Sequence, residues 1–447
     1  MEGIIFFFLL LAVTLFQLGD NGLTRLAASL DVFDVASLSG VFMLILSSIG
    51  IYNRDAVYQF GVLLQRSAIF LFIIVFLGLV AWAVDDILPW INISSYVSLI
   101  TLATVLYLFA IMGTRLAFIS MPKLDTFKTR VLVVGRGSLG QRIRNFLGNE
   151  GSHTLKQVGY IDLDDPAQSL ALAGDGATAD LCRLAREADA HEIVIASREW
   201  RGLPVWKLLD CKMSGTRITD YLSFWEREAG QIDLNEVKPS WLALSDGFRQ
   251  NGLHLFVKRT LDITVSLAFL LLTLPILVIA AALIKLESKG PVFYLQQRIG
   301  RHGRTFNAIK FRSMYVDAEK DGVPQWAAHL DPRVTRLGHV IRRARIDEIP
   351  QMFNVLRGDM SFVGPRPERP FFVKELSESI PLYDLRHNVR PGITGWAQIN
   401  YPYGASVEDA RRKLEYDLYY VKNGGLFLDF VIILQTVRVV LSGDGAR

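Results

Sequence analysis

Four apolar segments at the start of the chain constrain its fold more than any other feature. They lie at residues 3–18, 36–51, 68–84 and 96–118, and each is close to the length that crosses a bilayer as a helix. The chain of 447 residues is 51% hydrophobic, which is too apolar for an ordinary soluble protein. We therefore predict a four-helix transmembrane bundle over residues 1–120. Because the interiors of these segments carry no charges, we expect an anchor rather than a transport path.

Basic residues in the connecting loops indicate the orientation of this bundle. Two arginines separate the second and third segments, Arg115 lies near the end of the fourth and three basic residues follow it, whereas the other two loops carry only Arg25. Cytoplasmic loops are enriched in Lys and Arg, so both ends of the bundle are predicted to face the cytoplasm. The first segment has no basic stretch before it, which argues against a cleaved signal peptide. The residues concerned are Arg54, Arg66, Arg115, Lys123, Lys128 and Arg130.

Residues 125–250 are predicted to form a Rossmann-like α/β domain on the cytoplasmic side. Arg130–Gly135 has the pattern of a buried strand, and a glycine turn and the start of a helix follow it. Val158–Asp162 and Ile193–Ser197 are the next predicted strands. Gly135, Gly137 and Gly140 fit the dinucleotide-binding fingerprint, and Asp162 stands where a ribose-binding acid is expected.

Two interpretations of this glycine turn stay open. The three glycines can cradle a nucleotide, or they can serve close packing of strand and helix in a domain that binds nothing. No Tyr in the chain is followed four residues later by Lys, so the pair used by short-chain nucleotide-sugar oxidoreductases is missing. The two cysteines, Cys182 and Cys211, lack metal-binding spacing, exclude a disulfide scaffold and fit a reducing cytosolic face.

A second kind of apolar segment follows at Ile263–Ile284, with Pro275 near its middle. Its length suits a transmembrane helix, but proline interrupts helical hydrogen bonding at mid-depth. Basic residues flank both ends, and the soluble parts on either side both look cytoplasmic. We therefore predict a re-entrant membrane helix over residues 256–288 that bends at Pro275 and leaves on the face it entered. A spanning helix is the alternative.

The last part of the chain, residues 289–447, carries the candidate chemistry. Asp347 and Glu348 are adjacent carboxylates that directly follow a run of arginines ending at Arg345. Arg366 stands in a turn stiffened by prolines on both sides. Carboxylates among many cations suit phosphoryl transfer, because they can attack phosphorus or hold a metal ion while guanidinium groups neutralise phosphate oxygens. The alternative is a solvated helix with surface ion pairs. Further candidate phosphate ligands are Arg298, Lys310, Arg312, Arg345 and Arg390.

Four stretches together resemble one family, the bacterial sugar transferases that act as polyprenyl-phosphate glycosyl-1-phosphate transferases. The resemblance covers the whole chain in the long monotopic form of that family, which has a four-helix front and a Rossmann-like middle. It implies a C-terminal α/β catalytic domain with a re-entrant helix. The stretches are Lys258-Arg-x-x-Asp262, Gln297-Arg298 with Lys310-Phe-Arg-Ser-Met314, Arg345-x-Asp-Glu-x-Pro-Gln with Gly364-Pro-Arg-Pro367, and Arg390-Pro-Gly-x-x-Gly-Trp396.

The resemblance implies a two-step reaction at the bacterial inner membrane. Asp347 attacks the β-phosphorus of a UDP-sugar, which releases UMP and leaves a sugar-phosphoryl aspartate. Undecaprenyl phosphate then takes the sugar phosphate and starts exopolysaccharide or O-antigen synthesis. Mg²⁺ is the expected cofactor, with Asp347 and Glu348 as its candidate ligands, and Glu348 either binds metal or handles protons. Clustered cations are expected to keep Asp347 ionised at neutral pH.

Two other classes of function stay open. One is a membrane-bound NAD(P)-dependent enzyme that modifies nucleotide sugars, and the other is a non-enzymatic scaffold for polysaccharide assembly. The expected partners are a UDP-sugar, undecaprenyl phosphate, membrane lipid and a second copy of the chain in a homodimer, with no nucleic acid. The expected location is multi-pass in the cytoplasmic membrane, with the catalytic domain on its cytoplasmic face. Motifs leave the sugar itself undetermined.

Overall fold

The computed structural model describes most of the chain after residue 127. The described ranges are residues 128–148, 155–165, 181–198, 205–248, 252–316, 331–402 and 406–442, with isolated positions at 105–107, 113, 203, 318 and 404. The predicted four-helix bundle over residues 1–120 lies almost entirely outside them. The chain divides into two units, Met1–Tyr221 and Leu222–Arg447.

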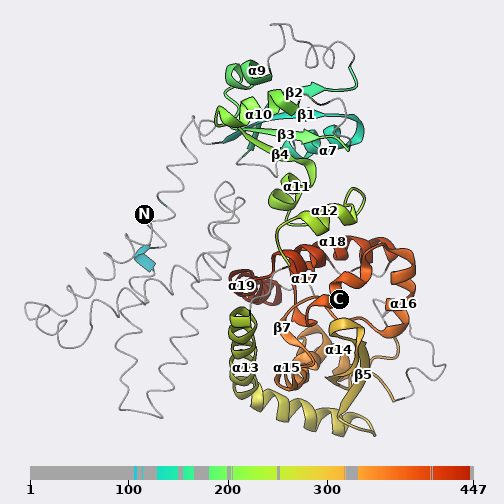
Figure 1. Ribbon diagram of the computed structural model, residues 1–447. Helices are drawn as coiled ribbons and strands as arrows, with labels where there is room; N and C mark the ends of the chain where they lie inside the picture. Colours follow the sequence, from blue (N-terminus) through green and yellow to red (C-terminus); the bar gives the residue numbers. More distant parts are fainter. Residues whose placement is uncertain are drawn as a thin grey trace, which may run out of the picture. The chain divides into compact units, whose positions relative to one another are not determined.

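The first unit contains a four-stranded parallel sheet in the order β2-β1-β3-β4 (Figure 1). Its central strands carry the unbroken apolar runs that burial on both faces requires, and residues 131–135 of β1 are all buried. Leu132, Val134, Ile193 and Ile195 form the core with the helices. The strands are β1 Thr129–Gly135, β2 Leu155–Asp162, β3 Glu192–Ala196 and β4 Arg217–Asp220, and the helices are α7 Gly137–Gly148, α9 Leu181–Glu187 and α10 Val205–Met213.

The two cysteines meet on one side of this sheet. Cys182 on α9 and Cys211 on α10 are both buried and are joined by a disulfide, with their Cα atoms 5.0 Å apart. The sequence predicted no disulfide scaffold and a reducing cytosolic face, so a bond between these two cysteines was not expected. They meet because α9 and α10 pack side by side against the same strands.

The second unit begins earlier than the sequence predicted. Ile232 and Leu242, in a stretch assigned to the α/β domain, are buried in one core with Leu414 and Leu418. Lys422 also forms an ion pair of 2.6 Å with Glu226. The apolar side chains of residues 222–250 thus cover the C-terminal domain, and the α/β unit ends at Tyr221. This stretch holds α11 Tyr221–Ala229 and α12 Pro239–Leu244.

The remainder of the second unit consists of short helices around two small sheets. Strands β5 and β6 form an antiparallel hairpin, and β7 pairs with β8 in parallel. The strands are β5 Phe293–Ile299, β6 Thr305–Phe311, β7 Ser361–Val363 and β8 Gly392–Thr394. The helices are α13 Gly252–Glu287, α14 Arg336–Arg343, α15 Met352–Arg357, α16 Pro370–Ser379, α17 Trp396–Asn400, α18 Val407–Asn423 and α19 Leu426–Ser442, with 3₁₀ turns η3 Arg301–Gly303, η4 Ile346–Gln351 and η5 Tyr383–Asn388.

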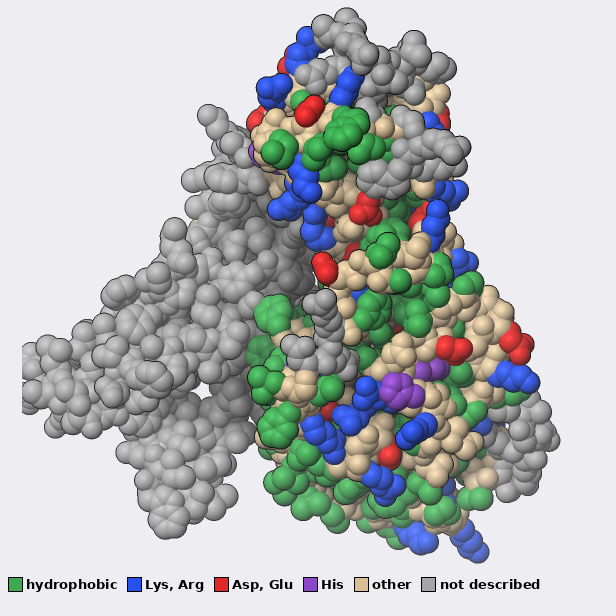
Figure 2. All heavy atoms as spheres, viewed as in Figure 1, with side chains coloured by type: hydrophobic (Ala, Val, Ile, Leu, Met, Phe, Trp, Pro, Cys, Tyr) green, Lys and Arg blue, Asp and Glu red, His purple; other side chains and the backbone are tan. Residues whose placement is uncertain are grey.

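Helix α13 is, among the described residues, the one helix long and apolar enough to cross a membrane by length and composition. It contains Pro275, and its direction changes part-way along (Figure 1). A helix of this length would be about 54 Å long if straight. Large apolar side chains such as Leu271 and Val278 are exposed along it, and Figure 2 shows hydrophobic side chains gathered at this edge of the unit. Such an exposed apolar surface marks an interaction site.

The Lys-Arg-x-x-Asp segment fixes the start of α13 to the rest of the unit. Lys258 forms an ion pair of 2.6 Å with Asp429 on α19 and donates to the carbonyl oxygen of Val363. Arg259 donates to the carbonyl oxygens of Val355 and Leu356 at the end of α15. Cations suit that position, because the last carbonyls of a helix have no partner within it. Asp262 accepts from Ser361 Oγ and from the N–H of Phe362 at β7.

Candidate active site

The adjacent carboxylates lie in η4, at the end of a sharp turn that follows α14. Thr335 caps the start of α14, where its hydroxyl accepts from the N–H of Gly338. Arg345 then adopts a left-handed conformation with φ 55°, which stops the helix and reverses the chain. This places Asp347 inside the domain, with only 9% of its surface exposed. The turn packs against β6, the strand that carries Lys310.

Glu348 is the carboxylate that the cations surround. Lys310 Nζ lies 2.9 Å from Glu348 Oε1, and the guanidinium group of Arg366 binds both Glu348 oxygens. Arg345 lies further away, with Nη1 3.7 Å from Oε2. Burial raises the pKa of Glu348, but Arg366 and Lys310 together outweigh it and hold that pKa well below the usual range. Glu348 is therefore ionised and engaged on both oxygens.

The carboxylate of Asp347 differs from that of Glu348 in both its contacts and its pKa. Among the described residues no side chain or backbone group forms a hydrogen bond or a close ion pair with its carboxylate. Burial and the neighbouring charge of Glu348 raise the pKa of Asp347 to about 6. The sequence predicted that clustered cations would keep Asp347 ionised at neutral pH, and a pKa near 6 leaves it mostly ionised at pH 7. The cations do not outweigh burial at this position, because Glu348 binds Lys310 and Arg366.

Burial also lowers the pKa of Lys310, and Glu348 counteracts this by favouring the charged amine. Lys310 and Glu348 thus each favour the charged form of the other. A buried carboxylate that binds two cations, next to a second carboxylate without a partner, is typical of a reactive site rather than of a surface ion pair. The solvated-helix alternative does not fit, because Asp347 and Glu348 are both shielded from solvent.

The turn that carries Arg366 is packed closely against the loop of Arg390. Strand β7 pairs with β8, and the N–H of Gly392 donates to the carbonyl oxygen of Pro365 over 2.9 Å. A Cβ atom at Gly364 would lie 2.3 Å from the carbonyl oxygen of Arg390, so only glycine fits there. The Gly-Pro-Arg-Pro turn and the Arg-Pro-Gly loop therefore lie side by side.

Comparisons with known proteins show which family the chain belongs to. Residues 253–443 match the sequence profile of a family described as "Bacterial sugar transferase". The "UDP-glucose:undecaprenyl-phosphate glucose-1-phosphate transferase" of Escherichia coli is 35% identical over 317 residues, covering 69% of this chain and 67% of that protein. This chain belongs to the bacterial sugar transferase family. The alignment is longer than the second unit, so it also includes part of the first.

Two other relatives of this sugar transferase match over smaller shares of their length. The "UDP-N-acetylgalactosamine-undecaprenyl-phosphate N-acetylgalactosaminephosphotransferase" of Aeromonas hydrophila is 50% identical over 195 residues, 44% of this chain and 46% of that protein. The "Undecaprenyl-phosphate glucose phosphotransferase" of Komagataeibacter xylinus is 35% identical over 324 residues, 69% of this chain and 58% of that protein. The chain thus spans about half the length of these two relatives.

Within the sugar transferase, Arg312 does not have the role that the sequence predicted. Its guanidinium group donates to the carbonyl oxygens of Ile284, Ser288 and Lys289, at the C-terminal end of α13. Both terminal nitrogens are therefore engaged in capping this helix, whose last carbonyls need donors. The prediction failed because a motif gives spacing along the chain and not the direction in which a side chain points.

Arg298 stabilises the turn that holds Arg366. Its Nη1 donates to the carbonyl oxygen of Pro367 over 2.8 Å and lies 3.3 Å from Glu368 Oε2. Burial lowers the pKa of Arg298, and Glu368 counteracts this. Arg390, also predicted to bind phosphate, lines a separate pocket with Lys258 and Arg301.

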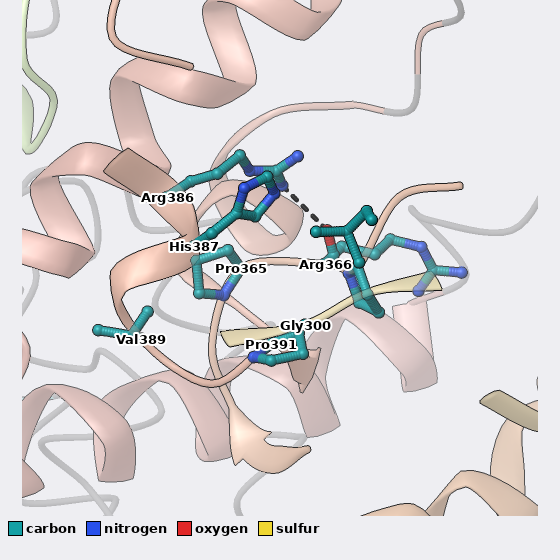
Figure 3. Close-up of a pocket in the computed structure, with 9 residues that line it drawn as sticks. Gly300, Pro365, Arg366, Arg386, His387, Val389 and Pro391 are labelled. Carbon is teal, nitrogen blue, oxygen red and sulfur yellow. Dashed lines mark hydrogen bonds between the residues drawn. The ribbon is translucent and has the colours of Figure 1, made fainter. Parts of the chain in front are cut away.

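Sequence reasoning missed Arg386. This buried guanidinium donates to Asp417 Oδ2 and to the hydroxyl of Tyr383, each over 2.7 Å, and to the carbonyl oxygen of Arg366 over 2.9 Å. Figure 3 shows the last of these bonds beside a small pocket between Pro365 and His387. Arg386 thereby fixes the backbone from which the Arg366 side chain reaches Glu348. No motif marks it, since its partners lie 20 and 31 residues away.

The glycine turn of the first unit is occupied by the protein's own groups. The N–H of Gly137, the first residue of α7, donates to Asp164 Oδ2 over 2.8 Å at the helix N-terminus, where a phosphate would bind. Asp162 Oδ1 accepts from the N–H of Asp164. A Cβ atom at Gly140 would lie 2.4 Å from the hydroxyl of Tyr160, and one at Gly135 would lie 2.7 Å from the Gly140 backbone. This geometry favours the close-packing interpretation of the glycines. Nucleotide binding is the other interpretation, and it is untested.

Proposed function

We propose that this sugar transferase moves a sugar 1-phosphate from a UDP-sugar to undecaprenyl phosphate and releases UMP, which starts the synthesis of an exopolysaccharide or O-antigen. The observation that carries the proposal is the carboxylate of Asp347, which has no hydrogen-bond or ion-pair partner among the described residues. The neighbouring Glu348 binds Lys310 and Arg366. This arrangement puts a free nucleophile next to two oriented cations. The names of the relatives, which specify undecaprenyl phosphate and either glucose or N-acetylgalactosamine, support it.

In the first step, an oxygen of Asp347 attacks the β-phosphorus of the donor. A bond forms between Asp347 and phosphorus, and the bond from phosphorus to the bridging oxygen breaks, so UMP leaves with that oxygen and its electron pair. In the second step, an oxygen of undecaprenyl phosphate attacks the same phosphorus and the Asp347 carboxylate departs. Lys310 and Arg366 neutralise the charge that builds on the phosphate oxygens in both steps.

In this scheme Glu348 positions the side chains of Lys310 and Arg366. Its two oxygens hold the Lys310 amine and the Arg366 guanidinium group, two donors that would otherwise have many rotamers. Fixing them in advance lowers the cost of binding a phosphate between them. A general-base role for Glu348 is disfavoured, because its low pKa makes it a weak proton acceptor.

The residues of the site fit Mg²⁺ if substrate phosphates and water supply ligands beside a carboxylate. No group of three His, Cys, Asp or Glu side chains that could hold a metal occurs among the described residues. Mg²⁺ is, however, commonly held by one or two carboxylates together with substrate phosphates and water. Asp347 has a free carboxylate for this, whereas both oxygens of Glu348 are engaged. The ion would neutralise diphosphate charge, with Asp347 as its protein ligand.

The bent helix α13 suits an enzyme with one soluble and one lipid substrate. A helix that enters one leaflet, bends at Pro275 and returns keeps both flanks on the cytoplasmic face. The contacts of Lys258, Arg259 and Asp262 tie the start of that helix rigidly to the catalytic unit. The active site would then be held at the height of the lipid phosphate. We accordingly place the protein in the bacterial inner membrane, with this unit on the cytoplasmic face.

The test is UMP release from a panel of UDP-sugars. Detergent-purified protein is supplied with Mg²⁺ and undecaprenyl phosphate, and Asp347→Asn is compared with Asp384→Asn, whose position is exposed. Lipid-dependent UMP release from one sugar, lost only in Asp347→Asn, is the expected result and also identifies the donor. If no sugar yields UMP, the proposed reaction is wrong. Equal activity of Asp347→Asn would instead exclude Asp347 as the nucleophile.

A further inference from the structure

A second pocket in this unit lies where two apolar helices begin. It is lined by residues from the first turns of α13, among them His254 and Lys258, and by Gly424 and Gly425, which directly precede α19. Its remaining lining includes Arg301 from the turn between β5 and β6, and Arg390 from the loop before β8. Polar residues at the start of membrane-associated helices lie at the level of lipid head groups.

The pocket carries a surplus of positive charge. Lys258 is paired with Asp429 over 2.6 Å, so these two charges cancel. Arg301 and Arg390 remain, and neither forms an ion pair with a carboxylate in the described part of the chain. Arg301 uses only its Nε, which donates to the carbonyl oxygen of Asn388 over 3.2 Å. Two half-buried guanidinium groups without a carboxylate form a site for an anion, and phosphate is the anion whose geometry they match best.

His254 provides an independent indication that something binds here. Both ring nitrogens are shielded from solvent, and neither has a hydrogen-bond partner among the described residues. Buried polar atoms in native proteins are nearly always hydrogen-bonded, so an unpaired imidazole in a pocket needs a ligand or water. A phosphate oxygen can accept from one of these nitrogens while the two arginines bind the others.

This pocket also lies beside the reaction site. Val389 lines both this pocket and the one that Arg366 lines. Arg390 belongs to the loop that packs on Gly364, two residues before Arg366. A lipid phosphate held here would therefore lie next to the pocket that Arg366 lines, beside the first turns of α13 and the start of α19.

We propose that His254, Arg301 and Arg390 form a binding site for the phosphate head group of a membrane lipid, and that the lipid it serves is the acceptor. This proposal rests on the proposed function for the identity of the acceptor. The same chemistry would hold the phosphate of an ordinary bilayer phospholipid, so the experiment has to distinguish the two sources.

The first measurement is the rate of UMP release at varied undecaprenyl phosphate and saturating UDP-sugar, and then the reverse. Arg301→Gln and Arg390→Gln should each raise the KM for the lipid by about tenfold or more, because each removes a charge-assisted hydrogen bond. The KM for the UDP-sugar should change by less than about twofold on the same reasoning. Arg304→Gln, in the same turn but exposed and outside the pocket, is the matched control.

The second measurement separates ligand sources without relying on turnover. Undecaprenyl phosphate should raise the Tm of the detergent-purified protein, undecaprenol should not, and Arg301→Gln and Arg390→Gln should lose the effect. If phosphatidylglycerol raises Tm in the same residue-dependent way while the KM for the acceptor is unchanged, the pocket binds a bilayer phospholipid instead. Unchanged KM and unchanged Tm shifts in both variants would overturn the site, even where UMP release confirms the reaction.

Discussion

Lys310 Nζ lies 2.9 Å from Glu348 Oε1, although 38 residues separate them in the chain. This ion pair decides the state of the neighbouring carboxylate, because the cation that could have lowered the pKa of Asp347 further is bound to Glu348. The site therefore contains two carboxylates with opposite environments. Glu348 is ionised and engaged, and Asp347 is desolvated, unpaired and available to attack.

The pH dependence of the reaction should report Asp347. Its pKa is raised to about 6, and only the deprotonated form can attack phosphorus, so kcat/KM for the UDP-sugar should rise between pH 5 and 7 with an inflection near 6. The measurement is kcat/KM for UMP release from pH 5 to 8. An inflection near 4 would show that Asp347 is not desolvated in the free enzyme.

Asp347 should also reduce stability at neutral pH. A carboxyl group whose pKa is higher in the folded than in the unfolded state destabilises the protein above that pKa, and the effect fades as the pH falls toward 4. Asp347→Asn should therefore raise the free energy of unfolding at pH 8 by up to about 3 kcal/mol, with little gain near pH 4. The Tm at both pH values checks this. A gain that is equal at both pH values would point to a cause other than ionisation.

Arg386 should affect catalysis through the position of Arg366. Lysine cannot reach Asp417, Tyr383 and the Arg366 carbonyl oxygen at once, so Arg386→Lys should lower kcat by about tenfold to a hundredfold. Arg366 also lowers the pKa of Asp347, so its displacement should move the kinetic inflection above 6. Arg357→Lys, at an exposed position, is the control. A lower Tm with an unchanged pH profile and kcat would show a structural role only.

The bend of α13 should depend on Pro275. Pro275→Leu restores a backbone donor and removes the clash with the preceding turn, so the helix should straighten and the activity in lipid nanodiscs should fall. Single cysteines at Leu253 and Leu286, both exposed near the helix ends, can be labelled in membrane vesicles of a variant without Cys182 and Cys211. In the parent protein, both cysteines should react with a label applied to the same face of the membrane. In Pro275→Leu, they should no longer both react from that face. Leu274→Ala is the control, and the same labelling and activity in both variants would show that the bend does not depend on Pro275.

The glycine turn of the first unit should not bind NAD(P). The Asp164 carboxylate accepts from the N–H of Gly137 and lies 3.1 Å from Arg136 Nε, so a pyrophosphate would have to displace it. Titration calorimetry of the purified full-length protein with NAD⁺ and NADP⁺ should show no heat of binding. Micromolar binding that strengthens in Asp164→Asn would instead establish a nucleotide site held closed by this carboxylate.

The sequence by itself determined the features that depend on neighbouring residues. The apolar run around Pro275 predicted a long helix that bends, and α13 is one helix of 36 residues with Pro275 inside it and a change of direction along it (Figure 1). The buried strands and glycine turn at 130–140 formed where the pattern placed them, since unbroken β-branched runs fit a parallel sheet covered on both faces. The adjacent carboxylates Asp347 and Glu348, and the arginines beside them in the chain, indicated the candidate site from sequence alone.

Only the tertiary structure decided which partner each charged group finds. Lys310 on β6 and Arg312 just after that strand stand two residues apart, yet Lys310 binds Glu348 while Arg312 caps α13. Arg386 acts on Arg366 without any motif to mark it. The pKa of Asp347 is raised although cations stand beside it in the chain, because desolvation depends on everything packed around a group. Sequence spacing encodes local periodicity, whereas ion pairing and burial arise only when distant segments pack together.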